Sequence, residues 1–341
     1  MTDNQKLTDP DYDYDRAELR KKLGAVHELP GSAKPNPILT VDSITRRFGG
    51  IAAVDVDHLE VQKGSITALI GPNGAGKTTF FNLLTGFDIP DKPRDGGTKP
   101  HWEFQGRSLA STSAYKVART GMVRTFQLTK ALSAMTVMDN MLLGSQQQTG
   151  ELLSRSTIWP IWRGKEKVIR AQAEELLDRF KLLEKKDDYA GSLSGGQRKL
   201  LEMARALMSN PAMIMLDEPM AGVNPALTQS LIGHIQDLRD TGTTVLFVEH
   251  DMHMVRFISD WVVVMAEGKL VAEGRPGNVM QNQAVIDAYL GSHHDQDLGD
   301  DAVLNEDFDT AIAEEDVELA KAEEAVEAYA ESVREKEGDG D

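Results

Sequence analysis

The chain has 341 residues, with 54 acidic and 37 basic side chains, no cysteine and a formal net charge of −17. The lack of cysteine excludes a disulfide scaffold, a zinc–thiolate site and a cysteine nucleophile. The acidic balance argues against a general nucleic-acid binder, because phosphate contacts need clustered Lys and Arg. At this length a single hydrophobic core is near its limit, so we expect two lobes or subdomains.

The two ends of the chain differ in composition from the part between them. Residues 1–37 are polar and end in a Pro/Gly/Ser-rich stretch, which predicts a flexible N-terminal arm. Residues 291–341 hold 19 acidic and 3 basic side chains, a net charge of −16, whereas residues 1–290 carry a net charge of −1. We therefore divide the chain into an arm at 1–37, a body at 38–291 and an acidic tail at 292–341. Because the body is nearly neutral, the exclusion of nucleic acid as a partner has to come from its motifs.

The acidic tail admits two interpretations. Its composition is typical of a solvated, disordered segment. Its apolar residues recur every seven positions, which also fits an amphipathic acidic helix that docks on a basic surface. The recurring residues are Ile312, Leu319, Val326 and Val333.

A membrane-spanning helix needs about 20 mostly apolar residues. The longest uninterrupted apolar run here has six, Trp261–Ala266, and nothing near the start of the chain resembles the apolar middle of a signal peptide. We expect a cytoplasmic chain, which can still sit on a membrane partner.

Strand-like and helical segments alternate along the body. Short apolar runs rich in β-branched residues predict strands, and the later ones are nearly continuous, as expected for strands buried on both faces. Apolar residues on one face predict a helix over 168–183, and Glu267-Gly268 predicts a hairpin turn. The predicted strands are Ile38–Val41, Ser65–Ile70, Ala212–Leu216, Thr243–Val248 and Trp261–Met265.

A phosphate-binding loop follows the second predicted strand. The run Gly71-Pro72-Asn73-Gly74-Ala75-Gly76-Lys77-Thr78 matches G-x-x-x-x-G-K-[ST] and opens a helical run at Thr79. Its glycines let backbone N–H groups turn toward phosphate oxygens, and the helix N-terminus adds positive potential. We expect Lys77 to reach the β- and γ-phosphates of a nucleoside triphosphate and the Thr78 hydroxyl to ligate Mg²⁺.

A second loop of similar chemistry opens a later helix. The run Leu193-Ser194-Gly195-Gly196-Gln197 precedes a helical segment that extends through Met208. Ser194 can cap this helix while its hydroxyl and the glycine amides face a phosphate, which makes a second anion site.

Together with the phosphate loop, this segment and four others resemble the ABC ATPases, over about residues 38–291. The resemblance implies an α/β P-loop NTPase of the ABC-ATPase fold. Such a fold has a RecA-like core, an antiparallel β subdomain and a helical signature subdomain, here at about 128–205. It also implies a head-to-tail dimer in which two ATP molecules lie between the phosphate loop of one chain and the Leu193–Gln197 signature of the other.

The remaining motifs of the resemblance assign catalytic roles. Asp217 and Glu218 end an apolar strand as in Walker B, and adjacent strand residues point to opposite sides, so the two carboxylates can take different roles. The resemblance implies that Asp217 holds Mg²⁺ and that Glu218 is the general base for the attacking water. It likewise implies that Gln127 meets Mg²⁺ and this water, that His250 contacts the γ-phosphate and that Phe48 stacks on adenine. The other interpretations are a solvated Gln127, a strand-end His250 bonded to backbone, and a core Phe48.

The branch of the family follows from three further segments. Ala221–Pro225 resembles a loop found in two branches, one that serves branched-chain amino acids and one that extracts lipopolysaccharide. Arg124–Gln127 and Val285–Gly291 resemble the ATP-binding subunits of the amino-acid branch. This implies an ATPase that drives transport of branched-chain or other hydrophobic amino acids through separate integral-membrane permease subunits. Its partners would be the permeases, a second ATPase subunit of the same or a paralogous chain, and indirectly a substrate-binding protein. It would lie in the cytoplasm, peripherally on the inner face of the cell membrane.

Three other functions stay open from the sequence. One is the ATPase of another transport system, such as lipid or lipopolysaccharide extraction or urea transport. Another is a soluble ABC ATPase of DNA repair, chromosome organisation or translation, although the long coiled coils, zinc modules or paired cassettes of such proteins are not seen here. The third is an interaction protein whose acidic tail is the functional part.

Overall fold

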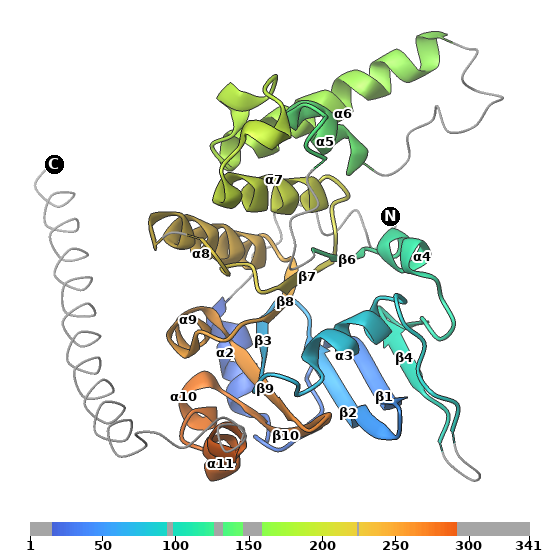
Figure 1. Cartoon of the computed structure of the whole chain (residues 1–341), viewed down its shortest axis with the longest axis vertical. Helices are drawn as coiled ribbons and strands as arrows, with labels where there is room; N and C mark the ends of the chain where they lie inside the picture. The colour runs from blue at the N-terminus through green and yellow to red at the C-terminus, as the bar shows by residue number, and fades with distance from the viewer. Residues whose placement is uncertain (1–15, 94–97, 126–131, 146–158, 224, 292–341) are drawn as a thin grey trace, which may run out of the picture. The chain divides into compact units, whose positions relative to one another are not determined.

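The computed structural model describes residues 16–93, 98–125, 132–145, 159–223 and 225–291. The chain divides into two units, Met1–Leu290 and Gly291–Asp341. The described part of the first unit is built on two sheets (Figure 1). The tail at 292–341, with its seven-residue pattern, lies outside the described residues.

The larger sheet has six strands in the order β10-β9-β3-β8-β7-β6, and all neighbours are parallel except β10, which runs antiparallel to β9. Successive residues of its central strands enter two different hydrophobic clusters. In β7, Ile214 and Leu216 belong to one cluster, and Met213 and Met215 to the other. Both faces of the sheet are thus covered, which explains the continuous apolar runs. The strands are β3 (Ile66–Ile70), β6 (Met122–Arg124), β7 (Met213–Asp217), β8 (Thr244–Val248), β9 (Trp261–Ala266) and β10 (Lys269–Gly274).

The smaller sheet is antiparallel, in the order β2-β1-β4-β5. It shares a buried cluster with α3 (Lys77–Leu84), in which Phe80 and Phe81 are fully buried. This cluster holds the antiparallel sheet against the helix that follows the phosphate loop. The strands are β1 (Pro37–Phe48), β2 (Ile51–Gln62), β4 (His101–Phe104) and β5 (Arg107–Ser108).

A helical subdomain lies at the opposite end of this unit from β1, β2 and β4 (Figure 1). It consists of α5 (Val137–Leu143), α6 (Trp159–Arg179) and α7 (Gly195–Leu207), which pack through Met141, Leu177 and Leu201. The remaining helices are α4 (Ala114–Arg119), α8 (Pro225–Asp240), α9 (Met252–Ile258), α10 (Pro276–Val279) and α11 (Gln283–Gly291).

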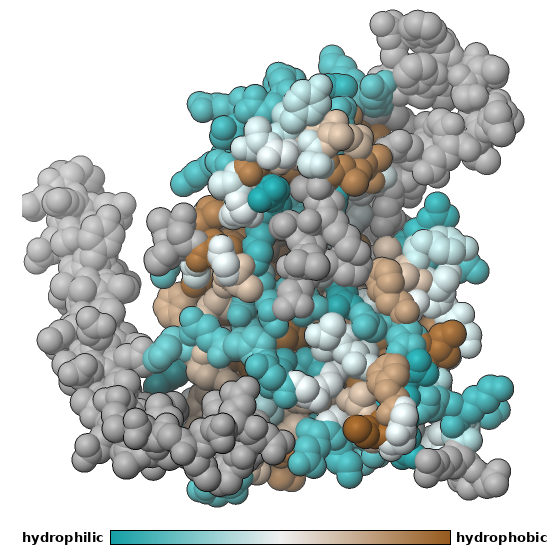
Figure 2. Space-filling view, viewed as in Figure 1, coloured by the Kyte–Doolittle hydropathy of each residue, from teal (hydrophilic) through white to brown (hydrophobic). Residues whose placement is uncertain are grey.

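The predicted strands are all present, with small changes at their ends, and the strand predicted at 38–41 extends as β1 to Phe48. The hairpin between β9 and β10 turns at Glu267 (φ 49°) and Gly268 (φ 80°), as predicted. Two consecutive positive φ angles are the geometry of a tight hairpin whose twist matches its strands. Among the described residues, no helix is long and apolar enough to cross a bilayer. On the face shown in Figure 2, apolar side chains form small patches among hydrophilic ones.

The N-terminal segment corrects the prediction of a flexible arm over 1–37. Residues Arg16–Gly24 form α2, whose Leu19 and Leu23 are 6% and 2% exposed and enter the same cluster as β1 and β2. Further along, Glu28 accepts hydrogen bonds from Arg275, which directly follows β10, and from Asn278 of α10. Composition alone predicted flexibility because these partners lie far away in the sequence. Residues 1–15 are outside the described part.

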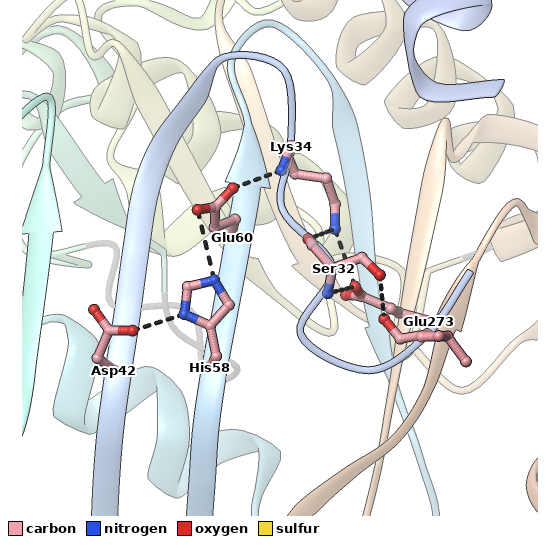
Figure 3. A network of polar contacts seen from close by, with 7 residues as sticks. Ser32, Lys34, Asp42, His58, Glu60 and Glu273 are labelled. Carbon is pink, nitrogen blue, oxygen red and sulfur yellow. Dashed lines mark hydrogen bonds and ion pairs between the residues drawn. The ribbon is translucent and has the colours of Figure 1, made fainter. Parts of the chain in front are cut away.

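A buried ion pair fixes this segment to β10 (Figure 3). The ammonium of Lys34 lies 3.1 Å from Oε1 of Glu273, and both side chains are at most 1% exposed. The same Oε1 accepts the N–H of Ser32 at 2.6 Å, and Lys34 Nζ lies 4.7 Å from the ring centroid of Trp261. On the other side, the backbone N–H of Lys34 donates to Glu60 of β2. The segment therefore connects β10 to the antiparallel sheet.

We expect the loss of one charge of this ion pair to destabilise the protein more than the loss of both charges. Glu273→Gln leaves the Lys34 ammonium buried without its counter-charge, and Lys34→Met does the same to the carboxylate, so each should lower the free energy of unfolding by about 3–5 kcal/mol. The double variant removes both charges and should be less destabilised than either single variant. Urea unfolding at pH 7 measures this, and additive losses in the double variant would contradict it.

Candidate nucleotide-binding site

The loop between β3 and α3 is shaped by glycines in positive-φ conformations. Gly71 has φ 148°, and a Cβ there would lie 2.0 Å from the carbonyl oxygen of Met265. Gly76 has φ 98°, and its Cβ would lie 2.0 Å from the carbonyl oxygen of Ala53. These two positions accept only glycine because the neighbouring backbone fills the space. The loop is thus held closely against the β9–β10 hairpin and β2.

Lys77 begins α3 with a side chain that is folded along this loop. Its Nζ donates to the carbonyl oxygens of Gly71 at 2.5 Å and Pro72 at 2.9 Å. Burial lowers the pKa of Lys77, although the carboxylates of Glu218 and Asp217 oppose this shift. The ammonium therefore lies at the point where the phosphate loop meets the carboxylates that follow β7.

Asp217 is the last residue of β7 and is 3% exposed. Its Oδ2 accepts a hydrogen bond from Arg124 Nη2 at 2.6 Å, and Nη1 of the same guanidinium donates to Asn82 of α3 at 2.6 Å. Oδ1 of Asp217 is a buried oxygen with no hydrogen-bond partner among the described residues. Arg124, at the end of β6, thus fixes one carboxylate oxygen and leaves the other to a ligand.

Glu218 and His250 face each other across two neighbouring strands. Oε1 of Glu218 lies 2.9 Å from Nε2 of His250. His250 follows β8, the strand paired with β7, so strand order alone brings these two residues together. The interpretation of His250 as a histidine bonded to backbone is wrong, because its ring contacts this carboxylate.

The backbone at Glu218 is unusual. Its φ is 48°, a conformation that a non-glycine residue adopts only when its surroundings impose it. The next residue after β8, Glu249, is 5% exposed and accepts the backbone N–H groups of Met220 at 2.9 Å and His250 at 3.2 Å. Burial raises the pKa of Glu249, and the Glu218 carboxylate adds to the rise, while the two N–H groups oppose it. Glu249 therefore ties the histidine to the segment after Glu218.

The second predicted anion site is the N-terminus of α7. Ser194 is its N-cap and forms a capping box with Gln197: its Oγ accepts the Gln197 N–H at 3.2 Å, and its own N–H donates to Gln197 Oε1 at 3.0 Å. The prediction that Ser194 caps this helix is confirmed. Apart from its chain neighbours and the backbone of its own helix, no atom of the described residues lies within 4 Å of the place where a Cβ of Gly195 would stand. The first turn of α7 is therefore open on this side, while Leu193 is buried beneath it.

Comparison with known proteins identifies the family. The family described as ABC transporter matches residues 54–221, and the family described as branched-chain amino acid ATP-binding cassette transporter matches residues 269–295. The high-affinity branched-chain amino acid transport ATP-binding protein LivG of Escherichia coli K12 is 41% identical over 258 residues, which covers 75% of this chain and 98% of that protein. The chain belongs to the ABC transporter ATP-binding family. It is accordingly an ATPase of the class that hydrolyses ATP to power transport.

Other comparisons agree with this membership. BraF of Pseudomonas aeruginosa, named as a high-affinity branched-chain amino acid transport ATP-binding protein, is 40% identical over 257 residues, 75% of this chain and 98% of its own. A nucleotide-free ATP-binding cassette from an ABC transporter has a TM-score of 0.63 at 36% identity and covers 74% of this chain and 98% of its own. The ADP conformation of an ATP-binding cassette of an ABC transporter has the same TM-score and identity, and the match covers 75% of this chain and 99% of that one. The ABC-ATPase fold predicted from the sequence is confirmed.

The aromatic residue predicted to stack on adenine lies at the surface of this ABC ATPase. Phe48 ends β1 and is 49% exposed, so the interpretation as a core phenylalanine is wrong. The Arg46 guanidinium lies 4.8 Å from its ring centroid and forms ion pairs with Asp88 and Asp91 of the segment after α3. Phe48 is therefore an accessible ring supported by a fixed cation. Gln127 lies outside the described residues, which resume at Leu132 after Thr125.

A groove of about 490 Å³ separates α4 and β6 from α5 and α7 in the ABC ATPase. Its lining includes the half-exposed apolar side chains of Tyr115 and Leu143, which are 60% and 52% exposed. Arg119 and Arg205 lie in the lining as well, so the groove combines apolar surface with positive charge. Arg124 also borders it, and this residue connects the groove to Asp217.

Sequence reasoning did not assign roles to Arg124 or Glu249. Arg124 ends β6 and Glu249 directly follows β8, and both strands lie beside β7, which carries Asp217. A charged residue at such a strand end was the signal that the sequence offered. What the sequence did not reveal is the partner of each residue, since Arg124 and Asp217 are 93 positions apart.

The two kinds of loop glycine provide a matched test. Gly76→Ala puts a Cβ against the Ala53 carbonyl, whereas Gly74→Ala meets nothing within 4 Å and bears only the strain of its positive φ. That strain costs about 1–2 kcal/mol. We expect Gly76→Ala to weaken ATP binding and lower the melting temperature clearly more than Gly74→Ala, as measured by nucleotide titration and thermal unfolding. Equal effects of the two substitutions would show that the close approach to Ala53 does not matter.

Proposed function

We propose that this ATPase energises the import of branched-chain or other hydrophobic amino acids through separate integral-membrane permease subunits. The observation that supports this best is that the matched region spans nearly the full length of relatives named for branched-chain amino acid transport. It covers 98% of the Escherichia coli and Pseudomonas aeruginosa proteins and 96% of a relative from Archaeoglobus fulgidus. The site residues fit the ATP-hydrolysing part of this role.

The adenine and the phosphates of ATP would bind to groups from two different sheets. Phe48 would stack on adenine, and the backbone of Gly71–Thr79 would surround the phosphates. Lys77 would exchange its two carbonyl partners for the β- and γ-phosphates, which is favourable because an ammonium–phosphate contact is charge-assisted. The two ends of the nucleotide would thus rest on different sheets.

Two described residues fit Mg²⁺, and Gln127 would be a third ligand. Oδ1 of Asp217 is a buried carboxylate oxygen with no partner among the described residues, and the Thr78 side chain is exposed at the start of α3. When bound, Mg²⁺ neutralises charge on the phosphates. Arg124, which donates to Oδ2 of Asp217, would hold the carboxylate with Oδ1 toward this position.

Glu218 would act as the general base. Its carboxylate would take a proton from the attacking water, and His250 would hold that carboxylate in place and contact the γ-phosphate. Catalysis of this kind depends mainly on positioning and charge. The strained backbone at Glu218 fits a residue whose orientation is selected for chemistry.

The signature would act on the nucleotide of a second chain. Ser194 and the amides of Gly195 and Gly196 open a helix N-terminus, which favours a phosphate through its dipole. ATP bridges two chains only in the closed dimer, so it would favour closure, and hydrolysis would release it. The second chain would be a copy of this one or a paralogous ATPase.

The groove beside β6 would receive the permease. It holds exposed apolar side chains and arginines between the catalytic sheet and the helical subdomain. A permease segment inserted there would be displaced when the sheet and the subdomain move relative to each other. This would place the ATPase in the cytoplasm against the inner face of the cell membrane. A substrate-binding protein would be linked only through the permease, and we expect no nucleic-acid partner.

Glu218→Gln tests the hydrolytic role. The amide keeps the size of the side chain but cannot take up the proton, so we expect ATP binding to persist, turnover to fall by at least about a hundredfold and a nucleotide-bound dimer to accumulate. Steady-state hydrolysis and size-exclusion chromatography with ATP measure these outcomes. Glu175→Gln, an exposed position on α6, is the control. Normal hydrolysis by Glu218→Gln would refute the assignment.

Co-purification from detergent-solubilised membranes tests the transport role. We expect multi-spanning subunits to be recovered with the chain and identified by mass spectrometry. Leu143→Asp places a charge in the groove and should abolish their recovery, whereas Val168→Asp, 69% exposed on α6 and outside the groove lining, should not. Recovery of soluble repair or translation proteins in place of membrane subunits would overturn the proposal.

A further inference from the structure

Lys199 is the fifth residue of α7, on the same helix as the signature, and its side chain points away from that signature toward the Walker B segment. Its Nζ donates to the carbonyl oxygens of Glu218 at 3.1 Å, Pro219 at 3.2 Å and Ala221 at 2.5 Å. An ammonium has three N–H groups. All three are therefore directed at one four-residue segment, which begins with the proposed general base.

We propose that Lys199 is a positioning residue for ATP hydrolysis, which holds the backbone of Glu218 in its strained conformation and links it to the signature helix. This inference rests on the proposed role of Glu218 as general base.

The strain at Glu218 explains why such a residue is needed. Its φ of 48° costs about 1–3 kcal/mol in a non-glycine residue, unless the surroundings impose that conformation. Its N–H donates to Val248 of β8 at 3.0 Å, and its carbonyl oxygen accepts from Lys199 and from the Ala221 N–H at 3.2 Å. Lys199 gives this peptide unit a side-chain contact from the helical subdomain. Without it, the peptide at Glu218 loses a constraint on its orientation.

The charge around Lys199 favours the same arrangement. A small cavity next to its ammonium is also lined by Glu202, Asp217 and Glu218. Glu202, one turn further along α7, is 6% exposed. Burial lowers the pKa of Lys199, but Glu249, Glu202 and Glu218 oppose this shift. The signature helix thus presents a cation to the acidic end of β7, and neutral residues there could not supply this attraction.

The link has a direct consequence for an ATP-bridged dimer. The first turn of α7 would contact the nucleotide bound to the other chain, whereas Glu218 would act on the nucleotide of its own chain. A shift of α7 on dimer closure would move the Lys199 ammonium and with it the Glu218 peptide. Lys199 would therefore make the alignment of each general base depend on the other nucleotide.

The test compares kcat with KM in the full-length protein. Lys199→Met removes the three hydrogen bonds but keeps the length of the side chain. We expect kcat to fall at least about tenfold, because small displacements of a reacting group are costly, with ATP affinity and melting temperature close to wild type. Lys199→Arg can still donate to these carbonyls and should recover most of the rate. Lys167→Met, an exposed lysine on α6, should change nothing.

Two results would overturn the proposal. One is a wild-type kcat in Lys199→Met; the other is a loss of rate that only matches a loss of folded protein or of ATP binding. If Lys199→Met does not fold, Lys199→Leu, which also has no donor, takes its place, and a wild-type kcat in that variant has the same meaning. Glu218→Gln is measured in parallel. Normal hydrolysis by that variant removes the proposed function itself, whereas an inactive Glu218→Gln with a fully active Lys199→Met removes only the role of Lys199.

Discussion

Burial of the six-stranded sheet on both faces is the constraint on which the rest of the site depends. Because β3, β8 and β7 are parallel neighbours with apolar side chains on both sides, their carboxyl ends meet at one edge. The polar residues that follow them therefore converge: the phosphate loop after β3, His250 after β8, and Asp217 with Glu218 at β7. Ligands of open α/β folds bind at this edge for the same reason. The positions of these residues thus follow from strand order, and the polar contacts of Arg124 with Asp217 and of Lys199 with Glu218 then fix their orientation.

Several residues at that edge have positive φ angles. Gly71 and Gly76 have them at positions where neighbouring carbonyls leave no room for a Cβ, whereas Glu218 has one although it carries a Cβ. The glycines let the loop approach its neighbours closely, so they relieve a steric problem. At Glu218 the strain remains, and two hydrogen bonds hold it: its N–H donates to the Val248 carbonyl, and its own carbonyl accepts from Lys199. A carboxylate held this way is oriented before any nucleotide arrives, which is the condition for catalysis by positioning.

The parts of this fold that sequence reasoning predicted are those with local signals. Continuous apolar runs located the parallel strands β3, β7, β8 and β9, although not the three-residue β6, and the phosphate loop, Walker B pair and signature each form a contiguous motif. The parts it missed depend on contacts between distant positions. Lys34 and Glu273 are 239 positions apart, so a polar N-terminal stretch looked like a flexible arm although it is tied to β10. Arg124, Lys199 and Glu249 carry charges that are visible in the sequence, but only the structure shows which oxygen or N–H group each one meets.

These charges explain why the site is stable before a triphosphate binds. Lys77 and Lys199 are half-buried or buried cations, and both donate to backbone carbonyls as well as facing carboxylates. Arg124 neutralises Asp217, and Glu249 accepts two backbone N–H groups. Each buried charge thus has a partner of opposite sign or dipole, as burial requires. The body of the chain is close to neutral overall while the acidic excess lies in the tail. When Lys77 turns to an incoming phosphate, the hydrogen-bond partners that it gives up are the Gly71 and Pro72 carbonyls, which are dipoles, and Asp217 keeps its ion pair with Arg124.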